Sequence, residues 1–185
     1  MEEWDERAYI ETAKKDPSAF GELYERYVDR IYSYIYHRVG NVHDAEDLTS
    51  RAFHRALSHL PAYEDKGIPF SAWLYRIAHN LVANWHRDRK RRPVVALDEL
   101  VTQSLAAQQP EAVAESQDNN QLLRDAIGKI DPARQELLVL KFTQGLSNAD
   151  IGSVMGRSEG AIKSLYHRTL LQLRTELRRK GLSIE

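Results

Sequence analysis

The chain has 185 residues, of which 42% are hydrophobic and 29% charged, which is enough for one or two small folded domains. It contains no cysteine, which excludes disulfides, thiolate metal ligands and thiol switches within the chain. No stretch approaches the roughly eighteen apolar residues needed to cross a bilayer. The acidic start also lacks the basic-then-apolar order of a signal peptide. We therefore expect a cytoplasmic protein without membrane insertion.

Residues 1–92 predict a succession of amphipathic helices. Asp16-Pro17 is a helix-start signal, with Asp as the cap and Pro at the first helical position. Apolar residues then recur at three- and four-residue spacing until Gly40 ends the helix. The residues expected to face inward are Phe20, Leu23, Tyr24, Tyr27, Ile31, Tyr34 and Ile35.

Two more helices are expected before residue 92. Asn41 can cap the first of them, which Pro61 stops, and the other begins near Ser71 and runs into the basic cluster at residues 86–92. The inner face of the first would be Ala45, Leu48, Ala52, Phe53, Ala56, Leu57 and Leu60. The inner face of the second would be Trp73, Leu74, Ile77, Ala78, Leu81, Val82 and Trp85. Its helical spacing favours a core position for Trp73 over a contact with a base.

Residues 93–118 predict a boundary between two domains. The segment opens with Pro93, contains Pro110, is rich in Gln, Ala and Ser, and shows no sustained apolar period. We therefore expect an acidic flexible linker between a domain at 1–92 and a domain at 119–185. Because no strand-like alternation persists, the predicted fold class is all-α, with two small helical domains.

The second domain contains the pattern of a helix-turn-helix. Ser147 can cap a short helix, Gly156 supplies the turn, and Ser158 caps a second helix. The apolar positions are Ala149, Ile151 and Val154 in the first helix and Ile162, Leu165, Leu170 and Leu173 in the second. The polar side of the second helix can meet phosphates and base edges. Taken alone, the segment also fits an ordinary helical hairpin packed into a bundle.

The net charge of −1 conceals blocks of opposite sign. Residues 1–65 carry 8 Lys and Arg against 14 Asp and Glu, and residues 66–92 carry 7 against 1. Residues 93–118 carry none against 5, and residues 119–185 carry 11 against 7. Two basic blocks separated by acidic ones indicate two polyanion contacts along one chain.

Together these features resemble the extracytoplasmic-function class of the sigma-70 family, the bacterial subunits that direct RNA polymerase to promoters. The resemblance rests on Asp44-Ala45-Glu46-Asp47-Leu48 followed by Phe53, on residues 70–80 leading into Arg-rich sequence, and on residues 145–173. The family implies two helical domains, called two and four, joined by a flexible linker. It also implies a factor with no catalytic chemistry of its own, which brings core polymerase to promoters and helps to open the minus-ten region.

The resemblance assigns residues to three binding surfaces. Those expected to dock on core polymerase are Asp44, Glu46, Asp47 and Leu48. Those expected to hold the melted minus-ten element are Tyr63, Phe70, Arg76, Asn80, Asn84, Arg87, Arg89 and Arg91. Those expected to read the double-stranded minus-thirty-five element are Arg157, Ser158, Glu159, Gly160, Lys163, Ser164, His167 and Arg168. The family commonly has Arg where this chain has His79, and this difference affects one expected phosphate contact.

The expected partners are core RNA polymerase and promoter DNA, and family members are often held inactive by an anti-sigma protein. No cofactor or metal is expected, because neither His54 and His59 nor His79 and His86 have the three- or four-residue spacing of a helical metal site. An enzyme is disfavoured because no catalytic constellation is identifiable. The alternative is a conventional helix-turn-helix regulator whose first domain senses a ligand, and binding to core polymerase would separate the two.

Overall fold

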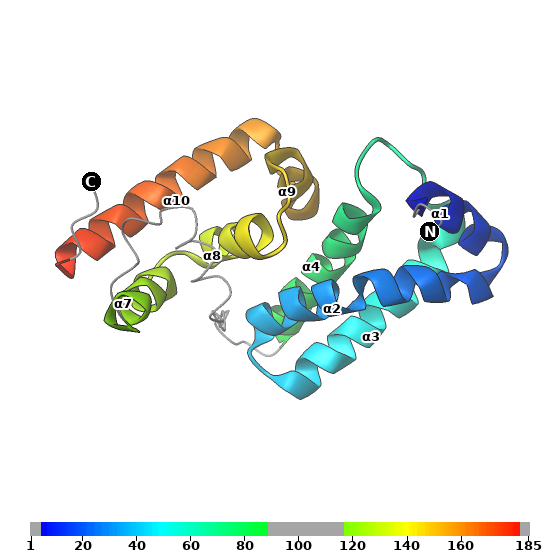
Figure 1. The fold of residues 1–185 in the computed structure, drawn as a ribbon, viewed down its shortest axis with the longest axis horizontal. Coiled ribbons are helices and arrows are strands. Elements are labelled where there is room, and N and C mark those ends of the chain that lie inside the picture. Colours follow the sequence, from blue (N-terminus) through cyan, green and yellow to red (C-terminus); the bar gives the residue numbers. More distant parts are fainter. Residues whose placement is uncertain (1–4, 89–116, 182–185) are drawn as a thin grey trace.

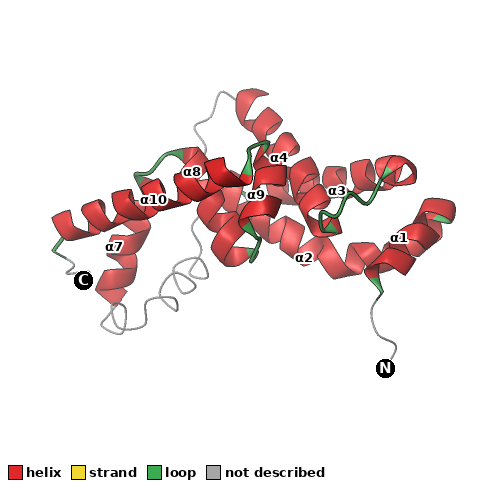
Figure 2. Ribbon diagram, turned by 90° about the horizontal axis from the view of Figure 1, so that it is seen from above, coloured by secondary structure: helices red, strands yellow, loops and turns green. Residues whose placement is uncertain are grey.

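A computed structural model describes residues 5–88 and 117–181, which are helical and contain no strand (Figure 2). The all-α prediction is confirmed for these ranges. The predicted linker lies outside them, except for Gln117 and Asp118, which begin a helix. The helices are α1 (Glu6–Lys15), α2 (Phe20–Val39), α3 (Val42–His59), α4 (Phe70–Asp88), α7 (Gln117–Gly128), α8 (Pro132–Leu138), α9 (Asn148–Met155) and α10 (Glu159–Arg179). Short 3-10 turns occupy Pro17–Ala19 and Leu60–Ala62, and a π-helical turn, η3, occupies Val139–Thr143.

Local sequence signals set the helix ends in the amino-terminal domain. Asp16 accepts a hydrogen bond from the Ser18 amide at 2.9 Å, but the residues after it form a 3-10 turn, so α2 begins at Phe20 rather than at Pro17. Gly40 ends α2 with a left-handed φ of 68°, as expected. Asn41 then caps α3 by accepting a hydrogen bond from the Asp44 amide at 3.0 Å. Helix α1 precedes this series and was not among the predicted helices.

The predicted inner faces of α2, α3 and α4 form most of the first core. Tyr24 is an exception, since it is 42% exposed and rests its ring edge-on against Phe53, with 4.9 Å between centroids. Leu57, Trp73, Ile77 and Trp85 are partly buried at the rim of this core. The 3.6-residue period predicts which side of a helix faces inward. It does not separate fully buried positions from partly buried ones at the edge of that side.

The two domains lie side by side and share a core (Figures 1 and 2). Helix α9 packs along α4, and η3 lies against α2. The residues of the carboxy-terminal domain that join the core of α1–α4 are Leu137, Val139, Leu140, Leu146, Ile151, Val154, Ile162 and Leu165. A second cluster lies within the carboxy-terminal domain alone and consists of Ala126, Ile127, Ile130, Leu138, Leu173 and Leu177.

The predicted helix-turn-helix is formed by α9 and α10. Ser147 and Asp150 make a reciprocal capping box at the start of α9, and Ser158 caps α10 by accepting a hydrogen bond from the Ala161 amide at 3.2 Å. Gly156 supplies the turn with a φ of 65°. Two expected core positions are wrong: Ala149 is exposed, and Leu170 is 39% exposed. Thr169 is buried in place of Leu170, because it continues the line from Ile162 and Leu165 to Leu173, and its hydroxyl is satisfied there by donating to the Leu165 carbonyl at 2.7 Å.

Gly152 is required by the close approach of the two helices. A Cβ atom at this position would lie 2.6 Å from the Arg157 carbonyl oxygen, which belongs to the turn. The same turn is closed by the Arg157 amide, which donates to the Gly152 carbonyl at 2.9 Å. A side chain at position 152 would therefore push the turn away from α9 and re-aim the start of α10.

We predict that Gly152→Ala destabilises the carboxy-terminal domain by about 1–3 kcal/mol through overpacking. Gly160→Ala is the matched control, because a Cβ there meets nothing within 4 Å. It should be neutral or stabilise α10 by up to about 1 kcal/mol, the difference in helix propensity. Hydrogen exchange across residues 147–165 measures both effects. Equal protection in the two variants would show that the contact of position 152 with the turn does not limit side-chain size.

Candidate nucleic-acid interface

The turn before α10 and the exposed face of α10 together carry all eight residues predicted to read duplex DNA. Arg157 and Ser158 lie in the turn before α10, and the rest lie in the first three turns of the helix. Each of the eight is exposed. The opposite face is held in the core by Ile162 and Leu165. A helix fixed along one side and capped at its amino end presents its first turns outward, as a recognition helix in the major groove must.

Two cations on this face have internal partners. The Lys163 ammonium lies 2.7 Å from a Glu159 carboxylate oxygen one turn earlier, and both side chains are at least half exposed. The Arg168 Nε donates to the Ser164 carbonyl at 3.2 Å. Exposed pairs of this kind contribute about 0–1 kcal/mol, so phosphate or a base edge can replace Glu159 as the partner of Lys163.

Helix α4 carries a second polar face. Arg76, Asn80 and Arg87 are exposed, and Asn84 is partly buried. Arg76, Asn80, Asn84 and Arg87 recur at three- and four-residue spacing, so the structure brings these predicted residues onto one side of the helix. Arg89 and Arg91, also predicted to contact DNA, lie outside the described residues.

Three aromatic rings meet where the loop between α3 and α4 joins α4. The centroids of Tyr63 and Phe70 are 5.4 Å apart, and those of Tyr63 and Trp73 are 4.9 Å apart. Phe70 is only 1% exposed, so it supports the other two rings rather than offering a face to DNA, contrary to the sequence-based expectation. Tyr63 and Trp73 are partly exposed and, together with Arg76, border a hollow of about 250 Å³.

The acidic face predicted to meet polymerase lies at the start of α3. Glu46 and Asp47 are exposed, with side-chain exposures of 63% and 65%, and Asp44 is partly buried in the first turn. Leu48 is 1% exposed and packs into the core, so it anchors the helix and does not reach the surface. The accessible part of the predicted docking surface therefore consists of the three carboxylates.

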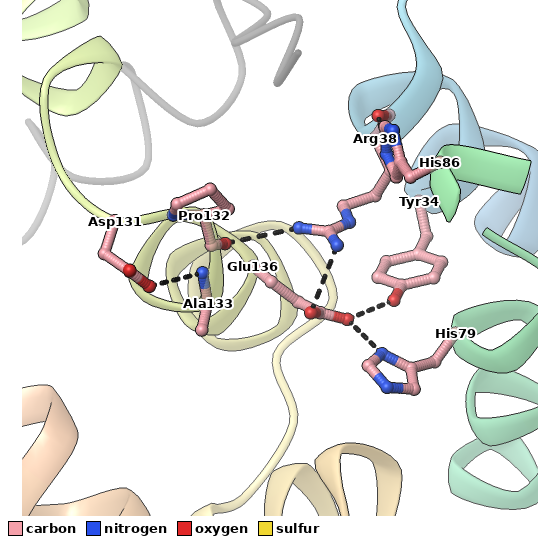
Figure 3. Close-up of polar contacts among 8 residues, drawn as sticks. All are labelled: Tyr34, Arg38, His79, His86, Asp131, Pro132, Ala133 and Glu136. Atoms are coloured by element: carbon pink, nitrogen blue, oxygen red, sulfur yellow. Dashed lines mark hydrogen bonds and ion pairs between the residues drawn. The ribbon is translucent and has the colours of Figure 1, made fainter. Parts of the chain in front are cut away.

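A buried carboxylate joins the two domains (Figure 3). Glu136, on α8, is 3% exposed and accepts a hydrogen bond from the Tyr34 hydroxyl at 2.5 Å. The His79 Nδ1 lies 2.6 Å from the same oxygen, and the Arg38 Nη2 lies 3.3 Å from the other. Arg38 also donates to the Pro132 carbonyl at 3.3 Å. Three donors from α2 and α4 thus converge on one carboxylate of the carboxy-terminal domain.

These contacts fix the protonation states of Glu136 and Tyr34. Burial acts to raise the pKa of the Glu136 carboxyl, but the hydrogen bond from His79 and the charge of Arg38 outweigh it, and the pKa lies below its ordinary value. Burial and the Glu136 charge raise the pKa of Tyr34 far above its ordinary value. Glu136 is therefore ionised and Tyr34 is a permanent donor.

Gln144 forms a second polar contact between the domains. The π-helical turn η3 brings its side chain inward, where it accepts a hydrogen bond from the Tyr75 hydroxyl at 2.6 Å. Its backbone carbonyl accepts a hydrogen bond from the Arg30 Nη2 at 3.0 Å. Burial raises the pKa of Tyr75 to about 12, so this hydroxyl also remains a donor.

Within the described ranges, no three His, Cys, Asp or Glu side chains gather closely enough to hold a metal ion. The helices of those ranges also include none that is long and apolar enough to cross a membrane.

Comparison with known families decides the identity of the fold. The family model of Sigma-70 region 2 matches residues 23–92, and the family model of Sigma-70 region 4 matches residues 120–173. The chain belongs to the sigma-70 family. Within the family it falls in the extracytoplasmic-function class, because its relatives in that class exceed 30% identity over most of the chain.

Two relatives and one solved structure show the extent of the similarity. The sigma factor BldN of Streptomyces coelicolor is 43% identical over 85% of this chain, and the match spans 60% of BldN. The sigma factor SigW of Bacillus subtilis is 34% identical, and the match spans 89% of this chain and 92% of SigW. The structure of CnrH in complex with the cytosolic domain of CnrY matches 94% of this chain and 97% of that chain, with a TM-score of 0.63 and 24% identity. At that identity the structural match supports the fold alone.

The contact around Glu136 was not predicted from the sequence. Glu136 lies beside the apolar run Leu137–Leu140, and Arg38 lies at the end of a helix whose other polar residues are mostly exposed. A charged residue next to an apolar run is the signal that could have indicated burial. Its partners lie 57 to 102 residues away in sequence, and periodicity within one helix does not reveal them.

His86 contacts the backbone of Arg38, and its surroundings predict that acid destabilises the amino-terminal domain. Its Nε2 donates to the Arg38 carbonyl at 3.0 Å. Burial and the nearby Arg38 charge lower the pKa of His86, and these effects exceed the opposing ones of the Arg38 carbonyl and Glu136. The unfolded chain therefore takes up a proton at His86 at a higher pH than the folded chain does.

We predict that the amino-terminal domain loses stability as the pH falls below about 6.5, the ordinary pKa of histidine, and keeps this contribution in full above it. Denaturant unfolding between pH 7.5 and 5.5, followed by tryptophan fluorescence, measures this, because the three tryptophans lie at positions 4, 73 and 85. His86→Asn should flatten the pH dependence. The control His59→Asn changes an exposed histidine and should not. An unchanged slope in His86→Asn would show that another group titrates.

Proposed function

We propose that this chain is a promoter-specificity subunit of RNA polymerase that acts in the cytoplasm and catalyses no reaction itself. It binds core polymerase, directs it to promoters and helps to open the minus-ten region. The observation that carries this proposal is the presence of sequences matching regions 2 and 4 in one chain, in that order. The chain spans only 60% of the length of BldN, so the proposal concerns the activities of these two regions.

The exposed face of α10 is proposed to read the minus-thirty-five element in the major groove. Arg157 and Lys163 can each donate to a guanine, and Glu159 can accept from a cytosine. Ser158, Gly160, Ser164, His167 and Arg168 complete the proposed contact surface. Because Lys163 is already paired with Glu159, binding exchanges one exposed ion pair for another and costs little.

The polar face of α4 is proposed to hold the melted minus-ten strand. Asn80 offers an amide to a base edge, and Arg76 and Arg87 follow the backbone, with Arg89 and Arg91 proposed to continue that path. The hollow beside Tyr63 and Trp73 is lined by partly exposed aromatic rings, which suit an unstacked base. Asn84 is proposed as a further polar contact.

The acidic face of α3 is proposed to dock on a basic surface of core polymerase. Glu46 and Asp47 protrude, and Asp44 lies in the first turn of the same helix. An anti-sigma protein is a further proposed partner, because the family commonly has one. The conventional helix-turn-helix regulator remains the second candidate. Titration of the chain with purified core polymerase separates the two, since only a sigma factor forms a stable complex that initiates at a promoter.

Replacement of Lys163 by Ala should weaken promoter recognition by about 1–3 kcal/mol if Lys163 reads a base, and should leave binding to core polymerase unchanged. Arg157→Ala and Arg168→Ala test the same face, and Thr175→Ala, an exposed change farther along α10, is the matched control. Transcription in vitro from promoters with altered minus-thirty-five sequences measures the effect. Promoter preference that stays constant across all three variants would mean that the DNA-facing side of α10 is assigned wrongly.

Docking and melting should be separable by mutation. Asp47→Lys should weaken association with core polymerase, because it places a like charge against a basic surface, whereas the control Glu11→Lys on α1 should not. Asn80→Ala should leave association intact and reduce opening of the minus-ten region. Native-gel assembly measures the first step, and permanganate reactivity of unpaired thymines measures the second. Normal opening by Asn80→Ala would remove Asn80 from the site.

A further inference from the structure

Tyr63 anchors the loop that joins α3 to α4. Among residues 61–69 every residue is exposed except Tyr63, which is partly buried. Its amide donates to the Leu60 carbonyl at 3.0 Å and closes the 3-10 turn that follows α3. The ring of Tyr63 is thus the part of the loop that packs against the rest of the amino-terminal domain.

Open space lies on both sides of Tyr63. On the α4 side is the hollow of about 250 Å³ that Trp73 and Arg76 also border. On the α1 side is a second hollow of about 210 Å³, lined by residues of α1, by Ile68 and by the start of α4. Because Tyr63 lines both hollows, a rotation of its ring would change the shape of both.

Two helices hold the Tyr63 ring in place. From α4 it is contacted by the rings of Phe70 and Trp73. From α1, the Lys14 ammonium lies 5.6 Å from the ring centroid, which is within the range of a cation–π interaction. The Lys14 side chain is only 19% exposed, and this partial withdrawal from water strengthens the attraction. Glu11 accepts a hydrogen bond from the same ammonium at 2.7 Å, so the cation is held between its own helix and the loop.

Helix α1 is a fixed support for this contact. Ile10 and Ala13 are 6% and 2% exposed and belong to the first core. Near the start of the helix, Glu6 accepts a hydrogen bond from the Tyr27 hydroxyl of α2. These contacts do not involve Lys14. Loss of the Lys14 charge should therefore leave the helix in place.

We propose that Lys14 is a positioning residue for capture of the melted minus-ten strand, because it holds the Tyr63 ring in the orientation that shapes the hollow for an unstacked base. This inference rests on the proposed function and adds α1 to that site. A base that enters the hollow then meets a wall already in place, so less ordering is required at the moment of capture. Without the Lys14 contact the ring should sample other orientations, and a smaller fraction of molecules should be ready to bind a base.

Two variants of Lys14 and a matched control test this role in the full chain bound to core polymerase. Lys14→Met keeps the apolar stem and removes the charge, whereas Lys14→Arg keeps a cation that can lie over the ring. Lys15→Met makes the same change of charge at the next residue, which is exposed. The time course of permanganate reactivity in the minus-ten region measures opening. Lys14→Met should slow it by about two- to fivefold, and Lys14→Arg and Lys15→Met should leave it close to the parent rate.

A double-mutant cycle tests whether Lys14 acts through Tyr63. Tyr63→Leu removes the ring, so Lys14→Met should have no further effect in that background. The salt dependence of promoter binding by the holoenzyme gives a second readout. Loss of a phosphate contact would reduce the slope of log K against log salt concentration by about 0.7–0.9, and Lys14→Met should leave this slope unchanged.

The contact itself can be tested without polymerase or DNA. Protons above the face of an aromatic ring are shielded by its ring current, so the NMR signals of the Lys14 ε-methylene group should lie upfield of those of Lys15. Tyr63→Leu should remove this difference. Since the shift is measured first in the parent chain, it remains decisive even if Tyr63→Leu disturbs the loop.

Three results would overturn the proposal: no upfield shift at Lys14, equal slowing by Lys14→Met and Lys15→Met, or additive effects of Lys14→Met and Tyr63→Leu. If Tyr63→Leu slows opening while Lys14 shows no shift, the role of Lys14 is refuted and the proposed capture surface stands. If the shift is present but neither Tyr63→Leu nor Asn80→Ala alters opening, the capture surface is refuted as well, and only the contact between Lys14 and Tyr63 remains.

Discussion

The Glu136 carboxylate is the group around which the two domains are arranged, because a buried ionised carboxylate must find donors wherever it lies. Tyr34 and Arg38 are one turn apart on α2, and His79 comes from α4, so the donors have correct spacing only if those two helices hold a fixed relation. The edge-on contact of Tyr34 with Tyr75, at 5.5 Å between centroids, provides that relation. Packing inside domain two thus prepares the site that receives domain four.

The helix-turn-helix is positioned from this same point. Asp131 caps α8 by accepting a hydrogen bond from the Ala133 amide at 2.8 Å, and α8 carries Glu136 into the interface. The helix then continues as the π-helical turn η3, which directs Gln144 towards Tyr75 before the chain enters α9. A π-helical turn adds one residue to a helical turn and so rotates the next segment of the chain. The orientation of α9 and α10 relative to domain two therefore depends on both Glu136 and Gln144.

Much of the fold and of the outer surfaces could be predicted from the sequence, because both depend on local rules. The caps at Asn41, Ser147 and Ser158 set helix starts where expected, and the exposed side of α10 follows from its apolar period. The errors arise where the apolar residue lies one position away from the buried line of its helix. Thr169 lies four residues from both Leu165 and Leu173 on the buried side of α10, where its hydroxyl is satisfied within the helix, and Leu170 is turned away from that side. The contact between the domains involves residues far apart in sequence, and no local rule pairs them.

The interface also gives a physical reason for the histidine at position 79, where the resemblance to the family predicts arginine. The imidazole Nδ1 reaches the Glu136 carboxylate at 2.6 Å beside the Arg38 guanidinium. An arginine at position 79 would place a second permanent cation next to Arg38 in a buried pocket, and only one carboxylate would face the two charges. A histidine donates the same hydrogen bond without requiring a second fixed charge. The histidine that stands in place of an expected phosphate contact on α4 thus suits the contact between the domains.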